Sequence, residues 1–296
     1  MNIKRSQFLA LALAAAASPA LAACGGKSAT SLKPVQINPE GEIKPREISW
    51  LLSRAANGAV INTMQEIAEE YAKDHKGFKL TLITTPDRPS YIQKYETLAA
   101  ANKLPELFDT DATPFAQKLA KQNRMVDVAA LLNDLGITDS FRKAALDYQR
   151  FDDGSLYMIP LEYGIEVFWY NKALFEAAGA EVPRSLDDFP ELCRKLAASG
   201  VTPIALDGLD GWPLERYVAF YPFRMEGEDY IKKLKKGEAA FADEPGKKMA
   251  QWLHDLGEAG AFQKGFSSVG YTDAQNLFTS GKAAMYCMGT WELPSL

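Results

Sequence analysis

Histidine and cysteine are scarce in this sequence. Its 296 residues include two histidines, His75 and His254, and three cysteines. The histidines lie far apart, and the cysteines show none of the paired spacings of zinc sites or disulfide frameworks. The sequence therefore predicts no metal site, no disulfide scaffold and no cofactor. Cys193 lies in an amphipathic pattern and Cys287 in an apolar strand, so we expect both to be buried.

Charge of one sign is not concentrated either. The chain has 33 Lys and Arg against 38 Asp and Glu, a formal charge of -5, and its pI is near 5.3. The Lys-rich stretch 231–238 is typical of a solvated helix face. This balance argues against nucleic acid as a partner and favours a neutral small molecule. With 47% apolar residues, the chain is long enough for two domains.

The N-terminus has the pattern of a secretory signal peptide, which we predict over residues 1–23. Two basic residues precede an apolar stretch over 8–17, which is too short to span a membrane durably. The residues "LAAC" at 21–24 resemble the lipobox of bacterial lipoproteins, in which the cysteine is lipidated. We therefore expect a lipid anchor at Cys24 and an extracytoplasmic domain. The alternative is plain secretion with cleavage near Ala23.

Residues 24–46 have the composition of a flexible tether. The stretch holds three prolines and three glycines and has little apolar character. Beyond it, strand patterns at 48–52, 78–83 and 105–109 alternate with helical patterns. The helical faces are expected at Ile61, Met64, Ile67 and Tyr71, and at Ile92, Tyr95, Leu98 and Ala99. Alternating strands and helices predict an open α/β sheet of parallel strands.

In such sheets the ligand crevice lies beyond the carboxyl ends of the strands. The polar residues that follow these three strands are Ser53, Arg54, Thr84, Asp87, Asp109 and Asp111. Further along, we predict strands at 156–160, 166–171, 201–207 and 282–289, with a helix around 249–256. Ser185 is expected to cap another helix, because two aspartates follow it in the first turn.

Two motifs occur in an order that resembles a known family. The first comprises Pro160, Tyr170, Asn171, Lys172 and Phe175. The second comprises Phe278, Gly281, Ala283, Ala284, Met285, Gly289 and Trp291. Together with the lipobox, they resemble bacterial extracellular solute-binding protein family 1, the carbohydrate-binding, maltose-binding-protein-like proteins of ABC importers. The resemblance covers residues 48–291, and one departure is Leu186, where the family often has Trp.

The resemblance implies an α/β fold of two lobes, the type II periplasmic-binding-protein-like fold. The first lobe would comprise residues 47–158, the hinge crossing 159–164, and the second lobe 165–296. Family members continue well past the second motif, so we expect the second lobe to be incomplete and the chain to be a fragment. The resemblance also implies a monomer that closes on a carbohydrate and delivers it to a membrane permease.

A sugar site pairs hydroxyl-binding polar groups with flat aromatic rings. The candidate ligand-binding residues are Ser53, Arg54, Asp109, Asp111, Glu162, Tyr163, Asp207, Trp212 and Trp291. Carboxylates would accept hydrogen bonds from hydroxyls, Arg54 would donate, and the three aromatic side chains would stack.

Several of these residues have structural alternatives. Asp109 and Asp111 could cap a helix that begins near Pro114. Glu162 could face solvent, and Glu166 is expected to do so because its neighbours in an alternating pattern are apolar. The other tryptophans at 50 and 169 lie within apolar strands and are expected in the core.

Other functions remain open at this stage. A lipid-anchored glycoside hydrolase would also combine carboxylates with aromatic residues in a cleft. However, no pair of carboxylates is identified as acid and nucleophile, so we expect a binding protein without catalysis. A polyamine, a metal chelate or a peptide could replace the sugar, since several carboxylates also suit a cation. A surface lipoprotein with a protein partner would show a broad apolar patch instead of a cleft.

Overall fold

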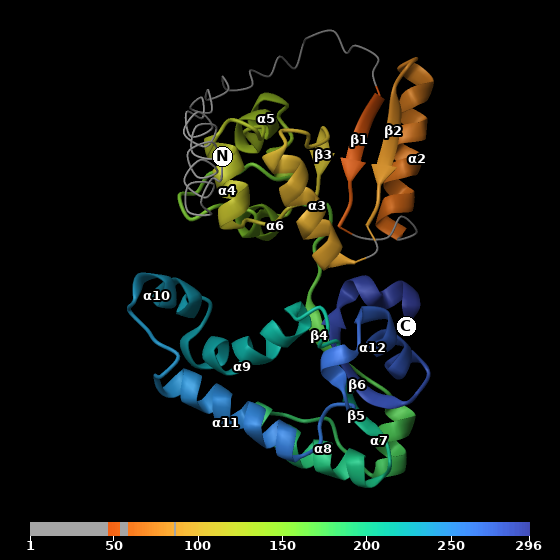
Figure 1. The fold of residues 1–296 in the computed structure, drawn as a ribbon, viewed down its shortest axis with the longest axis vertical. Coiled ribbons are helices and arrows are strands. Elements are labelled where there is room, and N and C mark those ends of the chain that lie inside the picture. Colours follow the sequence, from red (N-terminus) through yellow and green to blue (C-terminus); the bar gives the residue numbers. More distant parts are fainter. Residues whose placement is uncertain (1–46, 54–58, 86) are drawn as a thin grey trace, which may run out of the picture. The chain divides into compact units, whose positions relative to one another are not determined.

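The structure is a computed structural model that describes residues 47–53, 59–85 and 87–296 (Figure 1). The signal peptide, Cys24, the tether and Arg54 lie outside these residues. Internal contacts divide the chain into two compact units. Unit 1 includes Asp109–Leu161, and unit 2 includes Arg46–Phe108 and Glu162–Leu296. The predicted lobe boundaries group the residues differently and stay a prediction. Within the described ranges, no helix is both long and apolar enough to cross a membrane.

The first sheet of unit 2 is parallel, as the alternating pattern predicts. It contains β1 (Glu47–Leu51), β2 (Lys79–Ile83) and β3 (Leu107–Phe108) in the order β2-β1-β3. Strand β1 is central, and its Trp50 lies opposite Leu82 on one side and Leu107 on the other. Figure 1 shows β1 and β2 side by side with α2 beside them.

The helices that follow β1 and β2 are α2 (Ala59–Asp74) and α3 (Arg88–Ala100). In α2, Ile61 is buried but Ile67 is exposed, so the predicted apolar face is only partly correct. In α3, the buried residues are Tyr91, Tyr95 and Ala99. Ile92 was predicted on the buried face and is 38% exposed, because the helix is rotated to bury Tyr91 instead.

Asp87 caps helix α3 and does not extend freely from the sheet. Its carboxylate accepts a hydrogen bond from the backbone N–H of Ser90 at 2.7 Å, and this bond lowers the pKa of Asp87. We expect Asp87→Ala to lower the free energy of unfolding by about 1 kcal/mol, as loss of an N-cap does. Urea denaturation at pH 7 measures the loss. Asp87→Asn is the control and should retain most of the stability, so equal losses in both variants would contradict the cap.

Unit 1 is helical in its described part. Its elements are α4 (Pro114–Lys121), α5 (Val128–Asp134), η1 (Thr138–Ser140) and α6 (Lys143–Tyr148). The strand predicted at 156–160 is wrong. Leu156 makes only an isolated bridge with Arg150, and its carbonyl oxygen accepts a hydrogen bond from Val128 N–H at the start of α5. Its apolar side chain packs between helices rather than within a sheet.

The second sheet of unit 2 is mixed. It contains β4 (Glu166–Tyr170), β5 (Thr202–Ala205) and β6 (Ala283–Gly289) in the order β4-β6-β5. Strand β6 is central and fully buried; it runs parallel to β5 and antiparallel to β4. The prediction of parallel strands therefore holds for β5 and β6 but not for β4.

Helices surround this second sheet. They are α7 (Lys172–Ala178), η2 (Leu186–Asp188), α8 (Phe189–Ala198), η3 (Trp212–Leu214), α9 (Glu215–Glu226), α10 (Tyr230–Lys236), α11 (Glu244–Glu258), η4 (Phe266–Ser268), α12 (Tyr271–Thr279) and η5 (Thr290–Ser295). The predicted cap at Ser185 is confirmed, since Ser185 and Asp188 form a capping box at the start of η2. The largest core cluster includes Phe189, Leu196 and Trp252.

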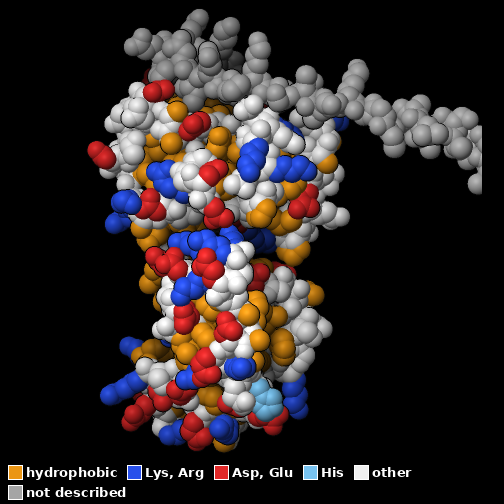
Figure 2. All heavy atoms as spheres, turned by 90° about the vertical axis from the view of Figure 1, so that its left-hand side faces the viewer, with side chains coloured by type: hydrophobic (Ala, Val, Ile, Leu, Met, Phe, Trp, Pro, Cys, Tyr) orange, Lys and Arg blue, Asp and Glu red, His pale blue; other side chains and the backbone are white. Residues whose placement is uncertain are grey.

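The predicted buried cysteines are confirmed. Cys193 and Cys287 are free and buried, and burial raises the pKa of each thiol to about 12. Trp50 is buried as expected, and Trp169 in strand β4 is partly buried and packs against the core cluster that contains Tyr286 and Met288. On the face drawn in Figure 2, acidic and basic side chains are interspersed, as the charge pattern predicts.

Candidate functional site

Asp207 follows strand β5 and is completely buried. Its Oδ1 accepts a hydrogen bond from Asp210 N–H at 3.1 Å, while Oδ2 is buried without a hydrogen-bond partner among the described residues. Burial raises the pKa of Asp207 to about 6. Gly208 comes next, and a Cβ there would lie 2.7 Å from the carbonyl oxygen of Phe266, so this loop needs glycine to pass so close to η4. The site therefore begins with a tightly packed turn after β5.

This turn leads directly into η3, where Trp212 begins the helical segment that continues as α9. Arg216 lies one turn further, in α9, and its guanidinium carbon is 4.6 Å from the centre of the Trp212 ring. That distance is typical of a cation–π contact. The indole Nε1 of Trp212 is buried and has no hydrogen-bond partner in the described part of the chain.

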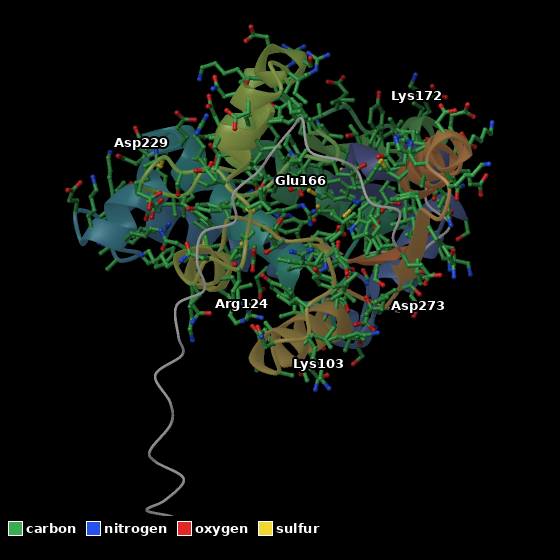
Figure 3. All side chains as sticks on the ribbon, turned by 90° about the horizontal axis from the view of Figure 1, so that it is seen from above. Lys103, Arg124, Glu166, Lys172, Asp229 and Asp273 are labelled. Carbon is green, nitrogen blue, oxygen red and sulfur yellow. The ribbon has the colours of Figure 1, made fainter. Side chains whose placement is uncertain are left out.

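Arg216 is held by Glu166 from strand β4. The guanidinium donates from Nε and Nη2 to the two carboxylate oxygens at 2.6 and 2.7 Å, a bidentate pair. The Arg216 side chain is 6% exposed and that of Glu166 is 44% exposed. In Figure 3, Glu166 lies in the interior of the view, whereas Lys172 and Asp229 reach outward. The expectation that Glu166 faces solvent is correct for its exposure but omits this ion pair.

Trp291 lies just past the end of strand β6, in η5, and its side chain is 38% exposed. Its ring lies against Gly289, where a Cβ would be only 2.1 Å from Cζ3 of the indole. The same ring is 5.9 Å from the guanidinium carbon of Arg216. Arg216 is thus within cation–π distance of two indoles. We call these residues, together with the carboxylate that holds Arg216, the indole cluster: Glu166, Trp212, Arg216 and Trp291.

A second set of contacts, through helix α12, links η5 to Trp212 of η3. Glu292, the neighbour of Trp291, is buried and accepts hydrogen bonds from Tyr271 Oη and from Gln275 Nε2, both in α12. The Tyr271 ring stacks on Trp212 with its centroid 6.1 Å away. The two donors favour an ionised carboxylate, but burial dominates and raises the pKa of Glu292 to about 7.

This raised pKa predicts a pH-dependent contribution to stability. Because the folded-state pKa of Glu292 lies above its ordinary value of 4.5, the native state favours the protonated carboxyl. The contribution is fully present below about pH 4.5 and is lost as the pH rises to about 7. Over this range we expect the free energy of unfolding of the wild type to fall by about 3 kcal/mol relative to Glu292→Gln. Urea titrations of both proteins across this range measure the difference, and a constant difference would contradict it.

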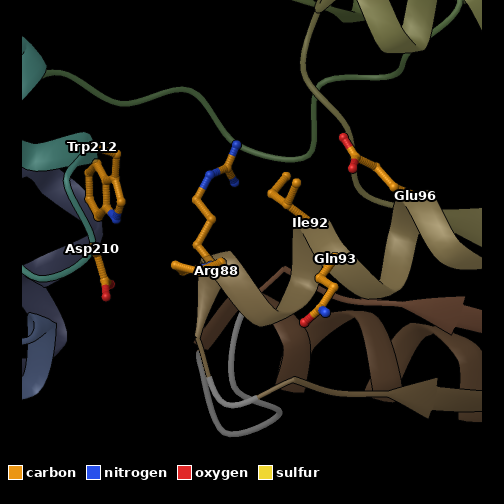
Figure 4. A pocket seen from close by; sticks show the side chains of 7 residues that line it. Arg88, Ile92, Gln93, Glu96, Asp210 and Trp212 are labelled. Carbon is orange, nitrogen blue, oxygen red and sulfur yellow. The ribbon is translucent and has the colours of Figure 1, made fainter.

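A pocket of about 450 Å³ within unit 2 is lined by Asp210, by Trp212 of η3 and by residues of helix α3. This volume is in the range of small-molecule sites. Figure 4 shows Trp212 and Asp210 together, and Arg88, Ile92 and Glu96 along α3. The pocket therefore combines an aromatic ring with charged and amide side chains, the combination that the sequence predicts for a sugar.

The structure describes eight of the nine predicted ligand-binding residues, all except Arg54. Trp212 and Trp291 both lie within cation–π distance of Arg216, and Asp207 is buried after β5. Ser53 and Asp109 are partly buried at the ends of β1 and β3. Exposed positions are taken by Asp111, Glu162 and Tyr163. The assignment of all nine as ligand contacts stays a prediction.

Neither Asp109 nor Asp111 is the N-cap residue of helix α4, although the sequence allowed this alternative. Thr113 occupies the N-cap position of this helix, and its hydroxyl accepts from Ala116 N–H at 3.2 Å. The cap alternative is therefore wrong for the first turn of α4.

Sequence reasoning missed Arg216, Tyr271 and Glu292 as members of this region. Arg216 had a usable signal, because it lies one helical turn after Trp212 and their side chains share a face. Glu292 and Tyr271 had none, since a carboxylate and a phenol far apart in sequence show no pattern. Within the described ranges, no group of three or more His, Cys, Asp or Glu side chains could hold a metal ion.

The fold and this region define the class of protein. The family model of bacterial extracellular solute-binding proteins matches residues 56–293. The chain belongs to this family, and it has the two-lobe α/β fold of the sugar-binding periplasmic proteins.

Individual relatives show the same similarity. The chain is 26% identical to an uncharacterized ABC transporter extracellular-binding protein of Pyrococcus horikoshii, over 79% of this chain and 55% of that protein. It is 30% identical to the multiple sugar-binding protein of Streptococcus mutans, over 48% of this chain and 35% of the relative. A solved structure from a study of xylan utilization by Caldanaerobius polysaccharolyticus is 28% identical, with a TM-score of 0.70, over 82% of this chain and 61% of that one. The chain thus spans about half the length of the curated relatives it matches or less.

Proposed function

We propose that this chain is the solute-binding component of an ABC importer and that it captures a sugar or oligosaccharide. The observation that carries the proposal is the indole cluster, in a chain of the solute-binding family. Indole faces stack on the apolar C–H faces of sugar rings, and carboxylates accept hydrogen bonds from hydroxyls. The Streptococcus relative is a multiple sugar-binding protein and the Caldanaerobius structure comes from a study of xylan utilization, which also favours carbohydrate.

The proposal includes the mode of action and the location. The protein binds without catalysis and delivers its ligand to the membrane permease as a monomer, and ligand binding shifts the population toward a closed form. Lipidation of Cys24 anchors it to the cell membrane on the extracytoplasmic side, at the cell surface or in the periplasm. The lipobox-like residues 21–24 support this part of the proposal.

The test is a thermal-unfolding screen against mono- and oligosaccharides, polyols and polyamines, with each mixture checked for hydrolysis products. A ligand at a hundredfold its Kd adds about 2.7 kcal/mol to native stability. A rise in the unfolding temperature with a sugar, without hydrolysis products, supports the proposal. A rise in the unfolding temperature with polyamines alone, or the appearance of cleaved sugar, overturns it.

Truncation of either indole of the cluster should weaken sugar binding selectively. We expect Trp212→Ala and Trp291→Ala each to raise Kd at least about tenfold, because tryptophans that pack against a ligand contribute much of the binding energy. Isothermal titration calorimetry with the sugar found in the screen measures this loss. Tyr148→Ala is the control, since Tyr148 is an exposed aromatic residue of unit 1. Equal effects in all three variants would contradict the assignment.

A further inference from the structure

The guanidinium of Arg216 has contacts on several sides. Two of its nitrogens donate to Glu166, and Nη2 also approaches the Met288 sulfur at 3.6 Å. The rings of Trp212 and Trp291 lie 4.6 and 5.9 Å from its carbon. The side chain is almost fully buried, so the carboxylate of Glu166 is the group that compensates its charge.

The sheet fixes this arrangement in space. Glu166 lies directly opposite Gly289 in the antiparallel register of β4 and β6. Gly289 has no side chain, and the Trp291 ring occupies the space that a Cβ would fill. The carboxylate that holds Arg216 and the glycine that admits Trp291 are therefore neighbours across one pair of strands.

The second link, through α12, closes a ring of contacts. Tyr271 stacks on Trp212 and donates its hydroxyl to Glu292, and Glu292 is bonded in sequence to Trp291. Trp212 and Trp291 are thus connected in two ways. Both lie against Arg216, and Tyr271 connects Trp212 to Glu292, the residue after Trp291. A change at Arg216 must therefore affect both indoles, although they belong to the separate segments η3 and η5.

We propose that Arg216 is a positioning residue that holds Trp212 and Trp291 in one fixed arrangement before the ligand arrives. This rests on the proposed function, in which the two indoles contact the sugar. Two rings that are already ordered lose less conformational entropy on binding than two independently rotating ones. Two of its nitrogens donate to Glu166, and the third, Nη1, is buried and has no hydrogen-bond partner among the described residues. Because none of the three nitrogens is both exposed and free to donate, Arg216 acts through the indoles and not as a ligand contact.

The first experiment needs no ligand. The full chain is labelled with 5-fluorotryptophan, and its five tryptophans are followed by ¹⁹F NMR, with Trp212→Phe and Trp291→Phe used for assignment. We expect Arg216→Met to shift and broaden the Trp212 and Trp291 resonances together and to leave Trp252 unchanged. Arg216→Lys should restore them only in part, because an ammonium lacks the planar fork. Lys233→Met is the control, since it breaks the ion pair of Lys233 with Glu226 in the same unit.

Glu166→Gln keeps the test decisive if Arg216→Met does not fold. It removes the charge of a half-exposed carboxylate and should move the same two resonances by a smaller amount. Unchanged Trp212 and Trp291 resonances in a folded Arg216→Met or Glu166→Gln protein would overturn the proposal.

The second experiment measures affinity for the sugar found by thermal screening. We expect Arg216→Met to raise Kd about tenfold, while Lys233→Met leaves it unchanged. An unchanged Kd despite moved resonances would overturn the role of Arg216 in binding. If the wild type binds no sugar, the proposed function fails, and the ¹⁹F spectra still decide whether Arg216 positions the indoles.

Discussion

Gly246→Ala is expected to lower the free energy of unfolding by about 3 kcal/mol, at the upper end of typical overpacking losses. Gly246 is buried near the start of α11. A Cβ there would lie 2.0 Å from the carbonyl oxygen of Phe241 and 2.6 Å from its carbonyl carbon. These are backbone atoms, which cannot move aside as the end of a flexible side chain can. The helix must therefore shift away from the preceding turn, and its contacts with the core loosen.

The same helix provides the control. A Cβ at Gly257 would meet nothing within 4 Å, and its backbone has no positive φ. Because alanine is the better helix former, Gly257→Ala should raise stability by about 0.5 to 1 kcal/mol. Urea denaturation of both variants measures the two changes. Similar changes in both, or a stable Gly246→Ala protein, would show that α11 does not pack as described.

Gly289→Ala is expected to weaken sugar binding about a hundredfold, or about 2.7 kcal/mol. The backbone at Gly289 is extended, with φ of -79°, so alanine fits the strand itself. Its methyl group, however, would lie 2.1 to 2.3 Å from three carbons of the Trp291 ring. The ring must leave its place, and the contact with Arg216 is lost. Calorimetric titration with the sugar and the intrinsic tryptophan fluorescence measure both effects.

Gly270→Ala is the matched control for this substitution. Its backbone is also extended, with φ of -88°, and a Cβ would lie at an ordinary 3.6 Å from a Leu209 methyl group. Sugar affinity should change less than about threefold, since an ordinary contact requires no displacement. If Gly289→Ala binds as tightly as Gly270→Ala, the place of the Trp291 ring does not matter for binding.

Much of the fold could be predicted because its signals are local. The strands β1, β2, β5 and β6 follow short apolar runs, and Ser185 with its acidic neighbours marks a helix start. The direction of β4 could not be predicted, because it depends on pairing with β6, which lies more than a hundred residues later. The false strand at 156–160 has the same cause: its apolar residues pack against helices that the local pattern does not show.

The candidate site also contains some residues that local sequence predicts and others that only the folded structure reveals. Trp212 was found because it lies between Gly211 and Pro213 past a strand end, where ligand-contacting residues gather. Trp291 was found from its similar position and from the resemblance to the family. The partner that joins them was missed, since Glu166 and Arg216 are 50 residues apart and only the folded sheet brings them together. Burial at Asp207 and Glu292 could not be predicted either, because each lies just past a strand end, where carboxylates are mostly exposed.

The central place of β6 has a consequence for folding. In the described chain β4 and β5 do not pair with each other, and both pair with β6. The second sheet therefore joins residues 166–170 to residues 283–289, whereas the first sheet needs only residues 47–108. Contacts of long sequence separation form slowly, so we expect the first sheet to form before the second.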